Sequence, residues 1–193
     1  MSMTEREKML AGLAYDSRDP ELLEMYHTAR AFMQAYNQID SRDLDGRQNL
    51  LHQMLGKVEE GVWIENPFFC DYGKHIEIGA NTFVNTNCIF LDDNFIRIGS
   101  DCLIGPYTQI YTAGHPLSAE ERIRSKPEAG GTYVTHTRPV TIGNKVWIGG
   151  NVVILPGVKI GNGVTIAASA LVKEDVPDHS LVVGNSGRVA KQL

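Results

Sequence analysis

The residues best suited to chemistry centre on one histidine. His115, within Gly114-His115-Pro116, stands where a regular repeat gives way to a long loop. Such a histidine is attached to a rigid body and is still reachable by a ligand. An imidazole with an unperturbed pKa of about 6.5 can act as a general base at neutral pH. The sequence therefore indicates proton transfer at His115, and the alternative is a loop histidine without a role.

Three further polar residues stand in, or just before, the neighbouring part of the repeat. Asn85 and Asp93 are close together in the chain, and Asp71 precedes the first recognisable repeat. Carboxylates and amides in a cleft suit the hydroxyl groups of a polyol or a sugar. Asn and Asp are also common at tight corners, where they satisfy backbone groups. From the residues alone, both interpretations stay open.

A six-residue repeat must position these side chains. Branched aliphatic residues recur at every sixth position, namely Ile142, Ile148, Ile154, Ile160, Ile166 and Val172. A smaller aliphatic residue follows four positions after each of them. A period of six does not hold one face of an α-helix, but it fits a parallel β-helix of short strands. The pattern begins at Ile78 and slips at Asp92-Asp93. We predict roughly four coils, over 78–95, 98–115, 142–159 and 160–177.

Helices should precede this solenoid. For the first helix, Asp19-Pro20-Glu21 provides an N-cap, a proline at the first helical position and an acidic first turn. A second helix should begin near Ser41 or Asp43 and end at a left-handed Gly56. Both helices are expected to cap one open end of the coils. Residues 116–139 lack the repeat, and a long loop in a regular body is usually functional or disordered. We divide the chain into a helical cap (1–58), the β-helix (59–185) and a C-terminal tail (186–193).

Composition narrows the function classes. A net charge of −5 without a basic block indicates neither a nucleic-acid ligand nor an anionic membrane. The three cysteines have no metal-ligand spacing, and Cys88 and Cys102 fit core positions. No H-x-x-x-x-H pair, P-loop or nucleophile elbow is present, so we predict no metal site. Without an apolar leader or span in this sequence, we expect a cytoplasmic protein with small ligands.

Longer motifs carry a family resemblance across almost the whole chain. The chain resembles the maltose and galactoside O-acetyltransferases, and looks closest to the maltose branch, in Ala14-Tyr15-Asp16, Cys70-Asp71-Tyr72-Gly73, Asn81-Thr82-Phe83-Val84-Asn85, Leu91-Asp92-Asp93, Tyr111-Thr112-Ala113-Gly114-His115-Pro116 and Ile142-Gly143-Asn144-Lys145-Val146-Trp147-Ile148-Gly149-Gly150. The resemblance implies a left-handed parallel β-helix in a homotrimer, with active sites at the subunit interfaces. It also implies acetyl-CoA as donor and a sugar hydroxyl as acceptor.

The same resemblance assigns roles to residues. His115 would be the general base for direct attack of the acceptor hydroxyl on the thioester, and Asn85 would line the catalytic cleft beside it. Asp16, Asp71 and Asp93 would contact the sugar. The residues that would bind coenzyme A are Trp147, Gly149, Gly150, Ala167, Ala168, Lys173, Arg188 and Lys191. The loop after Pro116 is longer than in that family, and Glu128 is our candidate for the acidic residue that orients His115.

Other functions remain open from the sequence. The acceptor could be a different hydroxylated molecule, such as an oligosaccharide or an antibiotic. A hydratase like the gamma carbonic anhydrases would use the same solenoid with three zinc-binding histidines, and the missing histidine pair counts against it. A non-catalytic β-helix scaffold is the third possibility, and the combination of His115, Asn85, Asp93 and Trp147 counts against that.

Overall fold

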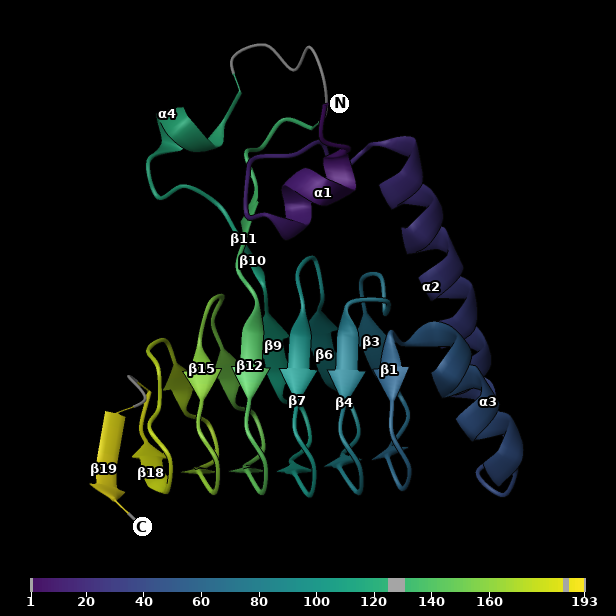
Figure 1. The fold of residues 1–193 in the computed structure, drawn as a ribbon, viewed down its shortest axis with the longest axis vertical. Coiled ribbons are helices and arrows are strands. Elements are labelled where there is room, and N and C mark those ends of the chain that lie inside the picture. The colour runs from purple at the N-terminus through teal and green to yellow at the C-terminus, as the bar shows by residue number, and fades with distance from the viewer. Residues whose placement is uncertain (1, 125–130, 186–187, 193) are drawn as a thin grey trace.

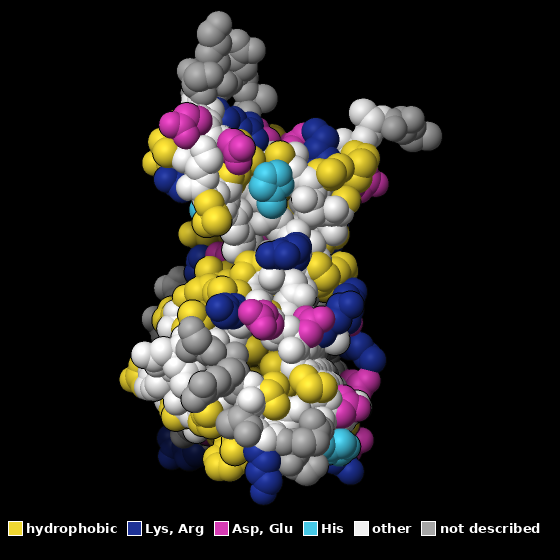
Figure 2. All heavy atoms as spheres, turned by 90° about the vertical axis from the view of Figure 1, so that its left-hand side faces the viewer, with side chains coloured by type: hydrophobic (Ala, Val, Ile, Leu, Met, Phe, Trp, Pro, Cys, Tyr) yellow, Lys and Arg dark blue, Asp and Glu magenta, His cyan; other side chains and the backbone are white. Residues whose placement is uncertain are grey.

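The body of the molecule is a solenoid of short parallel strands with helices at one end. A computed structural model describes residues 2–124, 131–185 and 188–192. In Figure 1 the coils stack side by side, the two longest helices lie beside the first coil, and a narrower part that contains the two short helices stands above the stack. Figure 2, which views the solenoid from its C-terminal end, shows the upper part joined to the solenoid by a waist.

Three sheets form the faces of the solenoid in the described part of the chain. Sheet A contains β1 (Lys57–Val58), β4 (Ile76–Ile78), β7 (Ile96–Ile98), β12 (Val140–Ile142) and β15 (Lys159–Ile160). Sheet B contains β2 (Trp63–Ile64), β5 (Phe83–Val84), β8 (Leu103–Ile104), β13 (Trp147–Ile148), β16 (Thr165–Ile166), β18 (Ser180–Val183) and β19 (Arg188–Gln192). Sheet C contains β3 (Phe68–Cys70), β6 (Cys88–Leu91), β9 (Gln109–Tyr111), β14 (Val153–Ile154) and β17 (Leu171–Val172). All pairings in these sheets are parallel except that of β18 with β19, so the predicted β-helix is confirmed.

The six-residue repeat forms the core. In sheet B, Val84, Ile104, Ile148, Ile166 and Val182 occupy matching positions on successive strands, and all are buried. Cys88 and Cys102 are buried as well, as expected for core positions. Each fully buried aliphatic side chain contributes about 1.5–3 kcal/mol relative to exposure, so stability accumulates coil by coil.

The coils begin earlier than the sequence pattern suggested. We placed the first repeat at Ile78 and expected roughly four coils, but β1, β2 and β3 form a complete coil before it. Val58 and Ile64 keep the six-residue spacing in this coil. The pattern is hidden because its third member is Cys70 instead of a branched aliphatic residue, and because Phe68 of β3 occupies the buried position that the smaller Cys88 holds in the next coil. The C-terminal tail is also more regular than predicted, because β19 pairs antiparallel with β18.

Three helices precede the coils. They are α1 (Glu5–Leu10), α2 (Pro20–Gln38) and α3 (Leu44–Met54), and the predicted caps hold, because the Asp19 and Asp43 carboxylates accept from the N–H groups of Glu21 and Gly46. Gly56 is not left-handed as predicted. A Cβ there would lie 2.4 Å from the Lys74 carbonyl oxygen, so close packing against the next coil requires the glycine.

Two helices close the first coil, as predicted. Helix α2 packs on β3, and α3 packs on β1. The fully buried Arg47 of α3 donates a 2.7 Å hydrogen bond to the carbonyl oxygen of Ile64 in β2, and its guanidinium stacks on Trp63. Tyr36 of α2 donates to the same carbonyl at 2.6 Å. The helices are therefore joined to the coil by polar as well as apolar contacts.

The loop at 116–139 is an ordered excursion where it is described. Strand β10 (Ala113–Gly114) leaves the body and pairs antiparallel with the returning β11 (His136–Thr137). The short helix α4 (Ala119–Arg122) follows Ser118, and Ile123 bridges to Tyr133 farther out. Among the described residues, no helix is both long enough and apolar enough to cross a membrane.

Candidate active site

Successive coils stack Asp71, Asp93 and His115 at the same corner. Strands β3, β6 and β9 are neighbours in sheet C, and these residues lie shortly after the carboxyl ends of those strands, where the chain turns toward sheet A. We call this column the His115 corner. The solenoid brings together residues that are 44 positions apart in the sequence, from 71 to 115, because each coil returns the chain to the same edge.

The two carboxyl groups form a partly buried pair. Their side chains hydrogen-bond each other, the Tyr15 hydroxyl donates to Asp93 at 2.9 Å, and the guanidinium of Arg30 lies 3.4 Å from Asp71. Burial, followed by the charge of Asp93, raises the pKa of Asp71 to about 7. Burial also raises the pKa of Asp93. The pair therefore shares a proton near neutral pH and can both donate to and accept from hydroxyl groups.

Asp92 holds this pair in place from inside the body. Its carboxylate is fully buried and accepts hydrogen bonds from the backbone N–H groups of Asp71 and Tyr72, each at 2.9 Å, and of His75 at 3.2 Å. Burial raises the pKa of Asp92 to about 7, against the opposing effect of these donors. The corner that presents Asp71 is thereby tied to the next coil.

The imidazole of His115 is exposed and oriented by the excursion. Its Nδ1 lies 2.8 Å from the carbonyl oxygen of Val134, on the returning arm. A carbonyl can only accept, so Nδ1 carries the proton in the neutral ring and Nε2 keeps its lone pair. Glu128, our candidate for this orienting role, lies outside the described residues. A hollow of about 480 Å³ beside His115 is lined by Gly114, Arg138 and Pro156, among others.

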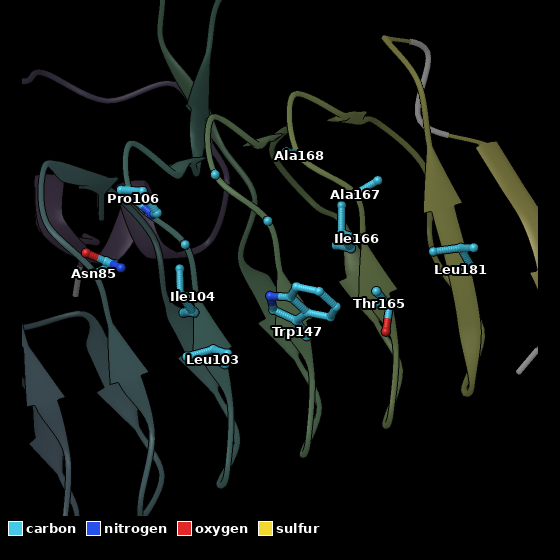
Figure 3. A pocket seen from close by; sticks show the side chains of 13 residues that line it. Asn85, Leu103, Ile104, Pro106, Trp147, Thr165, Ile166, Ala167, Ala168 and Leu181 are labelled. Carbon is cyan, nitrogen blue, oxygen red and sulfur yellow. The ribbon is translucent and has the colours of Figure 1, made fainter.

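A second site runs along the outer face of sheet B. A groove of about 610 Å³ is lined by residues from successive coils, including six of the predicted ligand-binding and catalytic residues: Asn85, Trp147, Gly149, Gly150, Ala167 and Ala168. Its floor is apolar, with Leu103 of β8, Trp147 of β13 and Leu181 of β18 projecting outward from sheet B (Figure 3). We call this the sheet B groove. Its length and apolar floor suit an extended ligand.

The glycines at the groove have different reasons for being small. A Cβ on Gly149 would lie 2.5 Å from the backbone nitrogen of Ala168, so coil stacking alone requires this glycine. A Cβ on Gly150 would meet the carbonyl oxygen of Pro106 at 3.2 Å, a milder contact. Gly150 is therefore the better candidate for a residue kept small to leave the groove open.

Asn85 offers a hydrogen-bond donor at one end of the groove. Its side-chain oxygen accepts from the backbone N–H of Thr86 at 2.7 Å, and this bond identifies the other terminal atom as the amide nitrogen. Figure 3 shows that nitrogen turned toward the side of Ile104 and Trp147. The Asn85 amide can therefore donate to a carbonyl or hydroxyl oxygen lying in the groove.

The predicted phosphate-binding residues fall in different places. Lys191 in β19 is opposite Leu181, so both share the outer face of sheet B beside the groove. Lys173 follows β17 and stands in line with the His115 corner, away from the groove. The backbone of Arg188 belongs to β19, but its side chain lies outside the described part of the structure.

Asp16 has a local role that the sequence did not indicate. Its carboxylate accepts from the N–H of Arg18 at 2.8 Å, which shapes the turn before α2. The adjacent Tyr15 makes the contact with Asp93 instead. Tyr15, Asp92, Val134 and Leu103 were missed as site residues. Only Leu103 had a usable signal, since it is a large apolar residue at the outward position before a buried one, as Trp147 is.

The two parts of the site lie at opposite ends of sheet C. Asn85 precedes β6, whereas Asp93 follows it, and Pro106 and His115 bear the same relation to β9. One strand length therefore separates the sheet B groove from the His115 corner in each coil. The described residues contain no cluster of three or more His, Cys, Asp or Glu side chains that could hold a metal ion.

Comparisons with known proteins give a consistent result. Residues 8–59 match the maltose acetyltransferase hexapeptide capping motif, and residues 139–174 match the bacterial transferase hexapeptide family with six repeats. Nodulation protein L of Rhizobium meliloti is 42% identical over 189 residues, which is 98% of this chain and 99% of the relative.

Two solved structures extend the likeness to the whole fold. A maltose O-acetyltransferase from Clostridium difficile is 37% identical with a TM-score of 0.93, and the match covers 100% of this chain and 99% of that one. A hexapeptide-repeat acetyltransferase from Vibrio cholerae, solved in complex with acetyl-CoA, is 38% identical with a TM-score of 0.88 over 99% of both chains.

Proposed function

Because the chain belongs to the hexapeptide-repeat acetyltransferases that carry the maltose acetyltransferase capping motif and use acetyl-CoA, we propose that it acetylates a sugar hydroxyl with His115 as the general base. The observation that carries the proposal is the hydrogen bond from His115 Nδ1 to the Val134 carbonyl, which leaves Nε2 free to take a proton. The carboxyl pair of Asp71 and Asp93 on the same corner supplies partners for the other hydroxyls of the acceptor.

The proposed reaction is direct transfer. His115 Nε2 removes the proton from the acceptor hydroxyl while that oxygen bonds to the acetyl carbonyl carbon. The imidazolium then gives this proton to the sulfur of coenzyme A as the carbon–sulfur bond breaks. The buried thiols of Cys70, Cys88 and Cys102 take no part, since burial raises their pKa and keeps them away from both sites.

Donor binding is assigned to the sheet B groove. Its apolar floor and small corner residues suit the narrow pantetheine arm, with the Trp147 ring as one wall. We expect Lys191, which is opposite Leu181 on the same face, to contact phosphate groups of the donor at the C-terminal end of the groove. Asn85, at the other end, would donate to the acetyl carbonyl or to the acceptor, where a preorganised donor favours developing negative charge.

The separation of the two sites supports an interfacial active site. Because His115 and Asn85 lie at opposite ends of sheet C, a second copy must bring its groove to the His115 corner for both to contact one reaction centre. A cyclic trimer repeats this contact three times with one interface. Lys173, stacked above the His115 corner, would then face the neighbour's groove. This arrangement explains why Lys173 stands away from the groove of its own chain.

Two experiments test the proposal. Purified protein is given acetyl-CoA with maltose, glucose or a β-galactoside, and thiol release is measured beside His115→Ala. Sugar-dependent release that disappears in the variant is expected, and no release with any sugar from folded protein would contradict a sugar acceptor. An oligosaccharide or a hydroxylated antibiotic would then be tried.

The second experiment tests the interface. His115→Ala and Asn85→Ala proteins, each nearly inactive, are unfolded together and refolded as mixed oligomers. If the two residues act across an interface, about one quarter of the sites in an equal mixture regain both. If they act within one chain, no mixed site has both residues and activity stays at the level of the separate variants.

A further inference from the structure

An exposed aromatic ring stands beside the catalytic histidine. The ring centroid of Tyr133 lies 6.2 Å from that of His115, with the two planes inclined at 59°. Tyr133 is 57% exposed in the single chain, so its ring is accessible from the side of His115 to a ligand or a neighbouring subunit. None of the residues assigned above to donor or acceptor binding explains a large aromatic side chain at this point.

The excursion holds this ring at a defined position. The backbone N–H of Val134 donates to the Arg122 carbonyl at 2.8 Å, and that of Arg124 donates to the Thr132 carbonyl at 2.9 Å, so the two arms are paired on both sides of Tyr133. The adjacent Val134 carbonyl accepts from His115. One segment therefore orients the base and presents the aromatic ring next to it.

Sugar rings have a chemistry that suits such a surface. One face of a pyranose carries several C–H groups with partial positive charge, and an aromatic face carries negative charge density. The carboxyl pair of Asp71 and Asp93 can recognise hydroxyl groups but offers nothing to the apolar face of a ring. An acceptor held at His115 would need a second contact of this kind to bind in one orientation.

We propose that Tyr133 is a specificity-determining residue whose ring stacks against the apolar face of the acceptor sugar. This inference rests on the proposed function and deepens it, because it commits the acceptor to a closed ring with a C–H face. The phenol hydroxyl is not required for stacking. The residue touches the acceptor and not the donor, so its loss should affect the two Michaelis constants differently.

The test compares Tyr133→Phe and Tyr133→Ala by steady-state kinetics with methyl glucoside and acetyl-CoA. Tyr133→Ala should raise the KM for the glucoside about ten-fold, and Tyr133→Phe should change it less than about two-fold. In both variants kcat and the KM for acetyl-CoA should stay near the wild-type values. Leu117→Ala, at a 98% exposed position of the same excursion, is the matched control and should behave as wild type.

The outcomes separate this inference from the function on which it rests. An unchanged glucoside KM in Tyr133→Ala, with active wild-type protein, overturns the stacking role alone. A fall in kcat together with a shifted pH–rate profile would mean that Tyr133 positions His115 through Val134, which also overturns it. Wild-type protein that transfers acetyl to no sugar would instead contradict the proposed function.

Discussion

Replacing Asp71 by Asn should change how the stability of this protein depends on pH. Burial and the charge of Asp93 raise the pKa of Asp71 from 3.8 to about 7. In that interval the folded state keeps a proton that the unfolded chain has released. The free energy of unfolding of the wild-type protein should therefore fall as pH rises from about 4 to 7. The amide of the Asp71→Asn variant would imitate the protonated carboxyl, because it can donate to Asp93 without titrating.

The magnitude follows from the shift. A proton that only the folded state holds changes the free energy of unfolding by about 1.4 kcal/mol per pH unit. Between pH 5 and 8, the free energy of unfolding of the wild type should therefore fall by roughly 3 kcal/mol through this group. For a chain of 193 residues, this corresponds to a change on the order of 5–10 °C in the difference between the two melting temperatures. The melting temperature of Asp71→Asn, measured relative to that of the wild type, should therefore rise by that amount between pH 5 and pH 8.

Thermal unfolding followed by circular dichroism at pH 5, 6, 7 and 8 provides the measurement. Both proteins must be at the same concentration, because oligomer stability depends on it. Asp101→Asn, which changes an exposed carboxyl at another corner, is the control. Its melting temperature should depend on pH in the same way as that of the wild type. If Asp71→Asn also runs parallel to wild type, the carboxyl pair does not share a proton and the electrostatic argument is wrong.

Three further changes have expected outcomes. His115→Ala should lower kcat by about 10²–10⁴-fold with an unchanged circular dichroism spectrum, and a smaller loss would remove the general base from the mechanism. Trp147→Ala should raise the KM for acetyl-CoA about ten-fold with little effect on kcat, because this 55% exposed ring lines the groove but not the reaction centre. An unchanged KM for acetyl-CoA would contradict donor binding in the sheet B groove. Arg47→Met should lower the free energy of unfolding, measured in urea, by about 2 kcal/mol, the value of one charged hydrogen bond. The loss should be no larger, because Tyr36 still donates to the Ile64 carbonyl. A loss near zero would mean that apolar packing alone holds α3 against the coil.

Much of the solenoid was predictable because its energetics are local and repeated. A branched aliphatic residue at every sixth position needs only the neighbouring coil to be buried, so the spacing of Ile142, Ile148 and Ile154 already implied stacked strands. The helix starts at Asp19 and Asp43 were likewise readable, since a cap involves only the next few residues. The first coil was missed because Cys70 and Phe68 depart from the usual residue types there, although the six-residue spacing is kept.

The site shows where sequence reasoning ends. Residue types and motif resemblance singled out His115, Asp71 and Asp93, but not the Val134 carbonyl that orients the imidazole, because any residue can supply a carbonyl. Tyr15 and Asp92 were also missed, since their roles depend on contacts with residues 78 and 21 positions away, respectively. These contacts exist only after the coils have stacked.

The solenoid is specified by residue spacing alone, because burial of one inward side chain per strand is a property of that spacing. The pairing of Asp71 with Asp93 as one partly buried unit is not specified in this way, and neither is the placement of the sheet B groove and the His115 corner at opposite ends of sheet C. Both became visible only in the folded chain, since proton sharing and cleft formation depend on distance and burial in space. Neither quantity is encoded in the separation of residues along the chain.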